Sequence, residues 1–254
     1  VGIDHFDCSL DNSNFTACTS PVRASNMADG AHILEVRAKD NVENISPSPS
    51  SFTWTVDTTA PTTNIESGVD GTNTAISNGG NTKSSIMTIT FSGNDTGIGI
   101  SGFECSIDKS NFTGCTSPLQ TGNLTDGEHI IEISAQDNVG NSGDSTPFTW
   151  IVDTSSPGTI IDSITDGRDE TIIMNGNTSS NSVLIQFAGT DTGVGVDHFE
   201  CSIDGADLVK CLSPLQIDRL TDGTHTLSIE SVDNSTNRDP SPAIFSWTVD
   251  TTPP

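Results

Sequence analysis

One pattern of residues recurs three times along the chain at an almost constant period. Its clearest marker is a Trp-x-Val-Asp sequence whose tryptophans, Trp54, Trp150 and Trp247, lie 96 and 97 residues apart. A long, regular period indicates tandem modules that repeat one fold. The chain, with 254 residues, also exceeds the length of one average domain. We therefore expect three modules, over residues 1–60, 61–157 and 158–254, of which the first lacks its first two strands.

Within a module, apolar and polar residues alternate over several short runs. In the second module this period of two predicts strands over residues 62–68, 86–91, 103–107, 112–115, 130–137 and 148–152. On the last of these runs, Phe148, Trp150 and Val152 lie on one face and should point into a core. Six to seven short strands joined by polar turns are typical of an antiparallel sandwich. The predicted fold class is therefore all-β, with tandem immunoglobulin-like β-sandwich domains.

Six cysteines recur in the same register as the tryptophans. Each pair has nine residues between its members, which favours one disulfide per module: Cys8 with Cys18, Cys105 with Cys115, and Cys201 with Cys211. A zinc site would need two close pairs or matching histidines, and one pair supplies only half of a tetrahedral site. Structural disulfides persist in oxidising compartments, so we expect an extracellular protein.

The disulfide of the second module is expected to staple a hairpin that closes at Asp108 and Phe112. Three residues would then form the loop, and the last of them should adopt a left-handed conformation, which Asn111 tolerates. Asn14 and Asp207 occupy the equivalent positions in the other modules.

The charge balance excludes one class of partner. The chain carries 34 acidic and 9 basic residues, with a formal net charge of −25. Binding to nucleic acid requires Lys and Arg to neutralise phosphates, so nucleic acid is excluded as a partner. Carboxylates at this density attract divalent cations and keep a secreted surface soluble, although a solvated acidic face explains them as well.

Several functional motifs are absent from the sequence. It contains no nucleophile elbow, phosphate-binding loop or metalloprotease motif, and we expect that the protein is not an enzyme. No run approaches the roughly 18 apolar residues of a membrane span. No signal peptide begins at Val1, so an export signal or anchor would lie outside these residues.

Further motifs recur around the cysteines and the tryptophan, with substitutions in individual modules. They include Phe-Glu-Cys-Ser-Ile-Asp, Ser-Pro, Leu-Thr-Asp-Gly-x-His, Ala-x-Asp-Asn-x-x-Asn and Trp-x-Val-Asp-Thr-Thr-Ala-Pro. In combination, over essentially the whole chain, they resemble the immunoglobulin-like repeats of large secreted bacterial and archaeal surface proteins. The resemblance implies adhesive, stalk-like or filamentous roles and no catalysis. Two departures are Glu43, in place of Gly, and the Ser-Ser-Pro at residues 155–157.

Acidic residues recur where one module should meet the next. The chain enters an immunoglobulin-like domain at the pole that carries its BC and FG loops, so the Asp that ends one module should approach an Asp in each loop of the next. The two expected groups are Asp57 with Asp95 and Asp137, and Asp153 with Asp191 and Asp233. Calcium takes six to eight oxygen ligands, so each group could hold one ion and stiffen the joint. The alternative is that these carboxylates cap turns through backbone hydrogen bonds.

Three histidines, His32, His129 and His225, recur in an Asp-Gly-x-His context at the entry to a strand. This context resembles the corner at which immunoglobulin-like folds place a Tyr that bonds back to the backbone, which favours a structural role over a catalytic one. Sequons occur at Asn14, Asn94, Asn111, Asn123, Asn177 and Asn234, and at Asn44, where a proline follows. They permit glycosylation without demonstrating it.

The incomplete first module raises a question of assembly. Its first residues align with residues 194–201, so it lacks the counterpart of residues 61–97. A sandwich without these strands would expose its core, and either upstream residues of a longer chain or another subunit would supply them.

The sequence favours a structural role for the array. We expect an extracellular filament, stalk or adhesin shaft at the cell surface, with further repeats or other copies of itself as partners. The alternative is a set of adhesin modules that bind carbohydrate or protein on a cell surface. A binder should expose an aromatic cluster, whereas every Trp here falls on an inward face.

Overall fold

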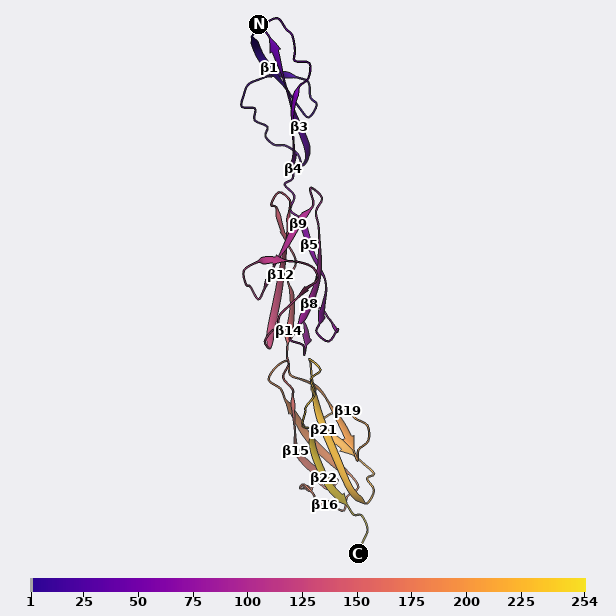
Figure 1. The fold of residues 1–254 in the computed structure, drawn as a ribbon. Helices are drawn as coiled ribbons and strands as arrows, with labels where there is room; N and C mark the ends of the chain where they lie inside the picture. Colours follow the sequence, from indigo (N-terminus) through magenta and orange to yellow (C-terminus); the bar gives the residue numbers. More distant parts are fainter. Residues whose placement is uncertain (1) are drawn as a thin grey trace.

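The computed structural model describes residues 2–254, and every regular element in that range is a β-strand. Three units follow one another along an elongated molecule, and the two termini lie at its opposite ends (Figure 1). The all-β class with tandem immunoglobulin-like sandwiches is therefore confirmed. Among the same residues, no helix is long and apolar enough to cross a membrane.

The second unit is a complete two-sheet sandwich. One sheet has the order β11-β8-β5-β6 and the other β10-β9-β12-β14-β7, with β13 paired to β12. The strands are β5 (Thr62–Asp70), β6 (Ala75–Ile76), β7 (Gly80–Thr82), β8 (Met87–Asn94), β9 (Ile100–Ile107), β10 (Thr113–Cys115), β11 (Leu119–Gln120), β12 (Gly127–Asp137), β13 (Ser142–Asp144) and β14 (Phe148–Val152). Each long strand overlaps a run predicted from the period of two, and β8 begins one residue after the predicted start at Ile86.

The third unit repeats this arrangement with small differences at the edges. Its sheets have the orders β15-β17-β20 and β16-β22-β21-β18-β19. The strands are β15 (Gly158–Asp166), β16 (Asn177–Thr178), β17 (Val183–Thr190), β18 (Val196–Ile203), β19 (Val209–Cys211), β20 (Leu215–Ile217), β21 (Gly223–Asp233) and β22 (Ala243–Val249).

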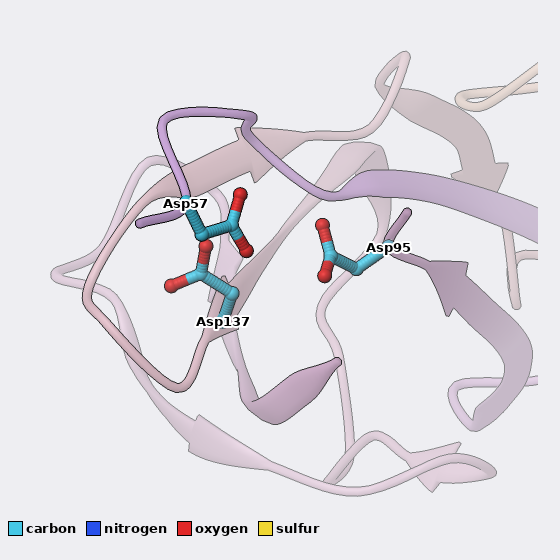
Figure 2. A group of neighbouring side chains, drawn as sticks. All are labelled: Asp57, Asp95 and Asp137. Carbon is cyan, nitrogen blue, oxygen red and sulfur yellow. The ribbon is translucent and has the colours of Figure 1, made fainter. Parts of the chain in front are cut away.

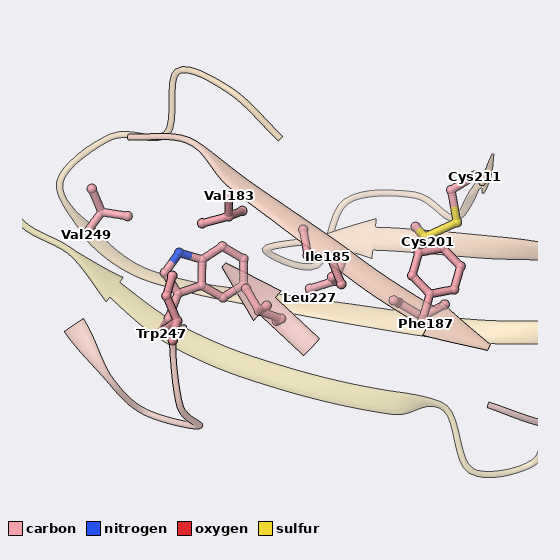
Figure 3. Packing of buried hydrophobic residues seen from close by; sticks show 11 residues of the cluster. Val183, Ile185, Phe187, Cys201, Cys211, Leu227, Trp247 and Val249 are labelled. Atoms are coloured by element: carbon pink, nitrogen blue, oxygen red, sulfur yellow. A yellow bond between two sulfur atoms is a disulfide. The ribbon is translucent and has the colours of Figure 1, made fainter. Parts of the chain in front are cut away.

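The core of each complete unit forms where alternate residues of the two sheets meet (Figure 3). In the third unit, Val183, Ile185 and Phe187 of β17 pack against Trp247 and Val249 of β22, and Trp247 is fully buried. Burial of a side chain of this size contributes several kcal/mol, because truncating a buried Trp or Phe to Ala typically costs about 3–5 kcal/mol. The predicted inward face of the last strand is therefore the centre of the core.

The first unit consists of one sheet, β2-β1-β3-β4. Its strands are β1 (Ile3–Leu10), β2 (Thr16–Cys18), β3 (Gly30–Asp40) and β4 (Ser50–Val56). This order matches that of β10, β9, β12 and β14 in the second unit. The three predicted disulfides are all formed, each between the first two strands of this sheet: Cys8–Cys18, Cys105–Cys115 and Cys201–Cys211.

The hairpin that carries each disulfide closes differently from the prediction. In the second unit the N–H of Ser110 donates to the carbonyl of Ile107, which leaves a loop of two residues. The residues with positive φ are Asp108 (53°) and Lys109 (60°), not Asn111. The same correction applies to Asn14 and Asp207, because the left-handed residues are Asp11 and Asn12 in the first unit and Asp204 and Gly205 in the third.

Candidate metal centre at the module junctions

The linker that follows each module is held by the module it leaves. After β4, the carboxylate of Asp29 accepts hydrogen bonds from the backbone N–H of Thr58 (3.1 Å) and from the hydroxyls of Thr58 and Thr59 (both 2.8 Å). These donors, the Thr59 hydroxyl foremost, hold the pKa of Asp29 below its ordinary value. The same contacts recur later, from Thr154 and Ser155 to Asp126 and from Thr251 to Asp222.

Asp57 joins this linker to the module that follows. Its Oδ2 accepts a hydrogen bond from the backbone N–H of Ile98 (3.0 Å), and its backbone carbonyl accepts one from the side-chain amide of Asn141 (3.0 Å). The second junction repeats both contacts at 2.8 Å, from the N–H of Val194 and the amide of Asn237 to Asp153. The two junctions therefore share one geometry.

Glycines allow the linker to lie against the next module. A Cβ atom at Gly97 would collide with the carboxylate of Asp57, and one at Gly193 would collide with that of Asp153. Such close approach of a side chain to the backbone requires the missing Cβ of glycine. The linker is thus packed on the following module rather than suspended as a free spacer.

Two loop carboxylates of the second module complete the first group. Asp95 follows β8, and its Oδ2 accepts hydrogen bonds from the N–H groups of Gly97 (2.9 Å) and Gly99 (2.8 Å). Asp137 ends β12 and accepts bonds from the N–H groups of residues 139–141 and from the Asn141 amide. Burial alone would raise the pKa of Asp137, but these hydrogen bonds, that of the Asn141 side chain foremost, lower it below its ordinary value.

Three carboxylates converge at each junction. One oxygen from each of Asp57, Asp95 and Asp137 lies within 4.8 Å of the other two, and the same holds for Asp153, Asp191 and Asp233. At the first junction the three side chains are turned toward one another (Figure 2). The structure therefore brings together both groups that the sequence singled out.

One carboxylate oxygen at each junction has no hydrogen-bond partner among residues 2–254. These atoms are Oδ1 of Asp95 and Oδ1 of Asp191, and both are buried. Turn capping accounts for the other oxygens of the loop carboxylates, since they accept backbone or amide N–H groups. It does not account for these two atoms, and buried acceptors without partners are rare.

The donor set fits a hard divalent cation. Three carboxylates within this distance repel one another unless a cation or proton is shared between them. Calcium is bound by carboxylate and carbonyl oxygens at about 2.3–2.6 Å in flexible geometry, and both kinds of oxygen are present at the junction. Asp57, Asp95 and Asp137 would hold the ion at the first junction, and Asp153, Asp191 and Asp233 at the second.

Sequence reasoning missed the residues that lock the linker in place. Asn141 and Asn237 each follow a junction Asp by four residues, and Gly97 and Gly193 each follow a loop Asp by two residues. The periodic recurrence of both spacings was a usable signal. Their role was invisible because each acts on a backbone or side-chain atom of the preceding linker.

The three repeated histidines occupy structural corners. Nδ1 of His225 lies 2.7 Å from Oδ2 of Asp204, and its Nε2 lies 2.8 Å from the carbonyl oxygen of Thr221. His32 and His129 make the same two contacts in their own modules. Both atoms that contact His225 are hydrogen-bond acceptors, and its imidazolium form, with a proton on each ring nitrogen, can donate to both.

The asparagines of the sequons are exposed side chains, as glycosylation would require: Asn14, Asn44, Asn94, Asn111, Asn123, Asn177 and Asn234. The amide of Asn234 donates to the carbonyls of Val194 and Gly195, at 2.9 and 3.0 Å. A glycan on that nitrogen would disturb a loop beside the second junction.

Comparison with known proteins gives a likeness only among solved structures. No protein-family model and no curated protein matches the chain. Fibronectin(III)-like modules of CbhA from Clostridium thermocellum are 13% identical over 74% of this chain and 94% of that one, with a TM-score of 0.43. A structure from a 1.5-MDa bacterial ice-binding adhesin is 15% identical over 98% of this chain and 88% of that one, with a TM-score of 0.40. A tetra-tandem repeat from the extending region of a large adhesion protein is 15% identical over 99% and 68%, with a TM-score of 0.30.

Proposed function

We propose that this chain is a structural segment of an extracellular surface protein, in which tandem modules form a stalk, adhesin shaft or filament. The observation that supports it is the pair of matching junctions. At each one, Asp57 or Asp153 accepts hydrogen bonds from a backbone N–H and from an asparagine side chain of the following module. A protein that spans a distance needs joints that repeat one geometry. The end-to-end arrangement of the modules supports the same role (Figure 1).

We further propose that each junction binds one calcium ion. The support is the convergence of three carboxylates together with the buried, unpartnered Oδ1 of Asp95 and Asp191. Extracellular calcium modules have dissociation constants of about 10⁻⁴–10⁻³ M. At a calcium concentration about ten times the dissociation constant, each site would stabilise its joint by about 1.4 kcal/mol.

The test is calcium titration of the chelated protein. Calorimetry should show a rise in melting temperature, and small-angle X-ray scattering should show a more extended and less variable chain. The double variant Asp95→Asn with Asp191→Asn keeps the volume of the side chains but removes one charge from each site. It should lose most of the calcium response. If melting and scattering of the natural chain are both indifferent to calcium, the ions are not part of the joint.

The alternative function, as carbohydrate- or protein-binding adhesin modules, has less support in the two complete modules. Among their described residues, the exposed large hydrophobic side chains are mostly aliphatic, and the one aromatic is Phe112, 42% exposed. Trp150 and Trp247 are fully buried. Recognition of a sugar ring normally uses an exposed aromatic face. Binding of the isolated chain to a glycan array would favour this alternative over the structural role.

A further inference from the structure

The first module presents an apolar face that its counterparts bury. Trp54 and Leu34 are half-buried, whereas their counterparts Trp150 and Ile131 are fully buried. The contrast is sharpest at Phe52, which is 68% exposed, while its counterpart Phe148 is 8% exposed. The strand order and the sequence of this sheet match those of the other modules, so the difference comes from what covers the sheet.

A hollow of about 530 Å³ lies over this apolar face. It is lined by the Cys8–Cys18 disulfide, Leu34, Phe52 and Trp54. In the second module the equivalent space is filled by Met87, Ile89 and Phe91 of β8, all buried. The hollow thus has the size and chemistry of a strand that presents large apolar side chains at alternate positions.

Backbone groups beside the hollow also lack the strand partner that their counterparts have in the second module. In the second module, Leu119 and Gln120 of β11 pair with β8, and the hydroxyl oxygen of Ser117 accepts the N–H of Phe91 at 2.9 Å. In the first module the counterparts of β11, Val22 and Arg23, belong to no strand, and Val22 is 43% exposed.

The Ser20 hydroxyl and the β4 edge of the first module also lack the partners that their counterparts have. Ser213 accepts the N–H of Phe187 in the third module, but Ser20 in the first has no such bond within residues 2–254. On the opposite side, β14 pairs in parallel with β7, and β22 pairs in parallel with β16. Over the described residues, β4 pairs with β3 alone. The face therefore lacks one antiparallel partner at residues 22–23 and one parallel partner at β4.

We propose that this face binds a β-strand segment of the same repeat type, which supplies a second sheet as β5, β6 and β8 do in the second module. Its inner strand carries apolar residues at alternate positions, like Met87, Ile89 and Phe91, and pairs antiparallel with residues 22–23. A stretch that precedes this inner strand, as β7 precedes β8, pairs in parallel with β4. A second copy of the sheet packed face to face would cover the hollow but would leave the β4 edge and residues 22–23 unpaired.

The experiment grafts the chain's own covering segment onto the open module. Residues 61–97 are fused directly ahead of Val1, so that Gly97 precedes Val1 as it precedes Ile98. Hydrogen exchange read by mass spectrometry should then slow in β4 and in residues 20–25 to the rates of β14 and residues 117–121. Tryptophan emission should shift to shorter wavelength as Trp54 becomes buried.

A matched control separates strand docking from mere chain extension. The same graft carrying Ile89→Asp places a charge in the hollow and should leave exchange in β4 and residues 20–25 fast. A synthetic peptide of residues 61–97, added to the unmodified chain, provides a second measurement, and it should protect the same segments in proportion to its concentration.

Two results would overturn the proposal. One is that both the graft and the peptide leave β4 and residues 20–25 as rapidly exchanging as in the unmodified chain. The other is that the unmodified chain sediments as a dimer with β4 already protected and keeps that state after grafting, which would make a second copy the occupant. Protection by the natural graft but not by its Ile89→Asp form supports the proposal.

Discussion

At the scale of single residues, the histidine corner of the third module should make its stability depend on pH. In the third module, burial alone would lower the pKa of His225, but the hydrogen bonds to the Thr221 carbonyl and to Asp204 raise it above its ordinary value. A group whose pKa is raised by folding stabilises the folded state fully below its unfolded pKa. That stabilisation is lost as pH rises through the folded pKa.

We therefore expect the third module to lose stability as pH rises from about 6.5, the ordinary pKa of His, through the raised value of His225. Calorimetric melting between pH 6 and 9 measures the slope. His225→Gln keeps a polar side chain but cannot become charged, so it should be less stable at pH 6 and flatten the dependence. His198→Gln, outside the corner, is the matched control. An equal flattening by both variants would assign the dependence to something other than the corner.

The junction glycines give a second prediction at this scale. Gly97→Ala places a methyl group against the Asp57 carboxylate, and overpacking of this kind typically costs about 1–3 kcal/mol. The melting temperature should fall and calcium should bind more weakly, because Asp57 must move. Gly114→Ala is the control, since nothing lies within 4 Å of its Cβ position. A Gly97→Ala protein that melts like the control would mean that the linker is not held in this position.

At the scale of the strand pair, each disulfide ties two strands that are already hydrogen-bonded neighbours. Replacing Cys201 and Cys211 by Ser should destabilise the third module by about 2–3 kcal/mol, the loop-entropy value for a ring of this length. Urea unfolding of the two proteins measures the difference. Intact mass before and after reduction should show three bridges in the natural chain. Free thiols in the native protein would contradict the assignment.

The strands were predictable from the sequence because burial imposes a period of two that local residues display. Met87, Ile89 and Phe91 are all inward, as their alternation indicates. The hairpin turn was not predicted correctly, because its left-handed residues are chosen by a distant contact. The Asp108 carboxylate accepts from the N–H of Ile130 and from His129, which places the turn at residues 108–109.

At the scale of the whole molecule, the order of the modules follows from the sequence, but the geometry of the joint does not. The period located the acidic residues that converge at each junction. It could not show that Asn141 would bind the carbonyl of Asp57 or that Gly97 would lie beneath its carboxylate. Such contacts join residues far apart in the chain, and only the packed structure brings them together.

The extended shape should depend on the linker being bonded on both sides. Inserting Gly-Ser-Gly between Thr58 and Thr59, and again between Thr154 and Ser155, would lengthen the covalent connection between modules. It would also draw Thr59 and Ser155 away from Asp29 and Asp126, to which their hydroxyls donate. Each module keeps its own core, so its melting should change little, while the radius of gyration from X-ray scattering should fall because the joints can bend. The same insertion between Gly122 and Asn123, exposed within the second module, is the control and should leave the radius unchanged. If the double insertion also leaves the radius of gyration unchanged, the joints do not keep the chain extended. Charge repulsion along a chain of net charge −25 then becomes the better explanation. In that case added salt should reduce the radius of gyration, because it screens the repulsion.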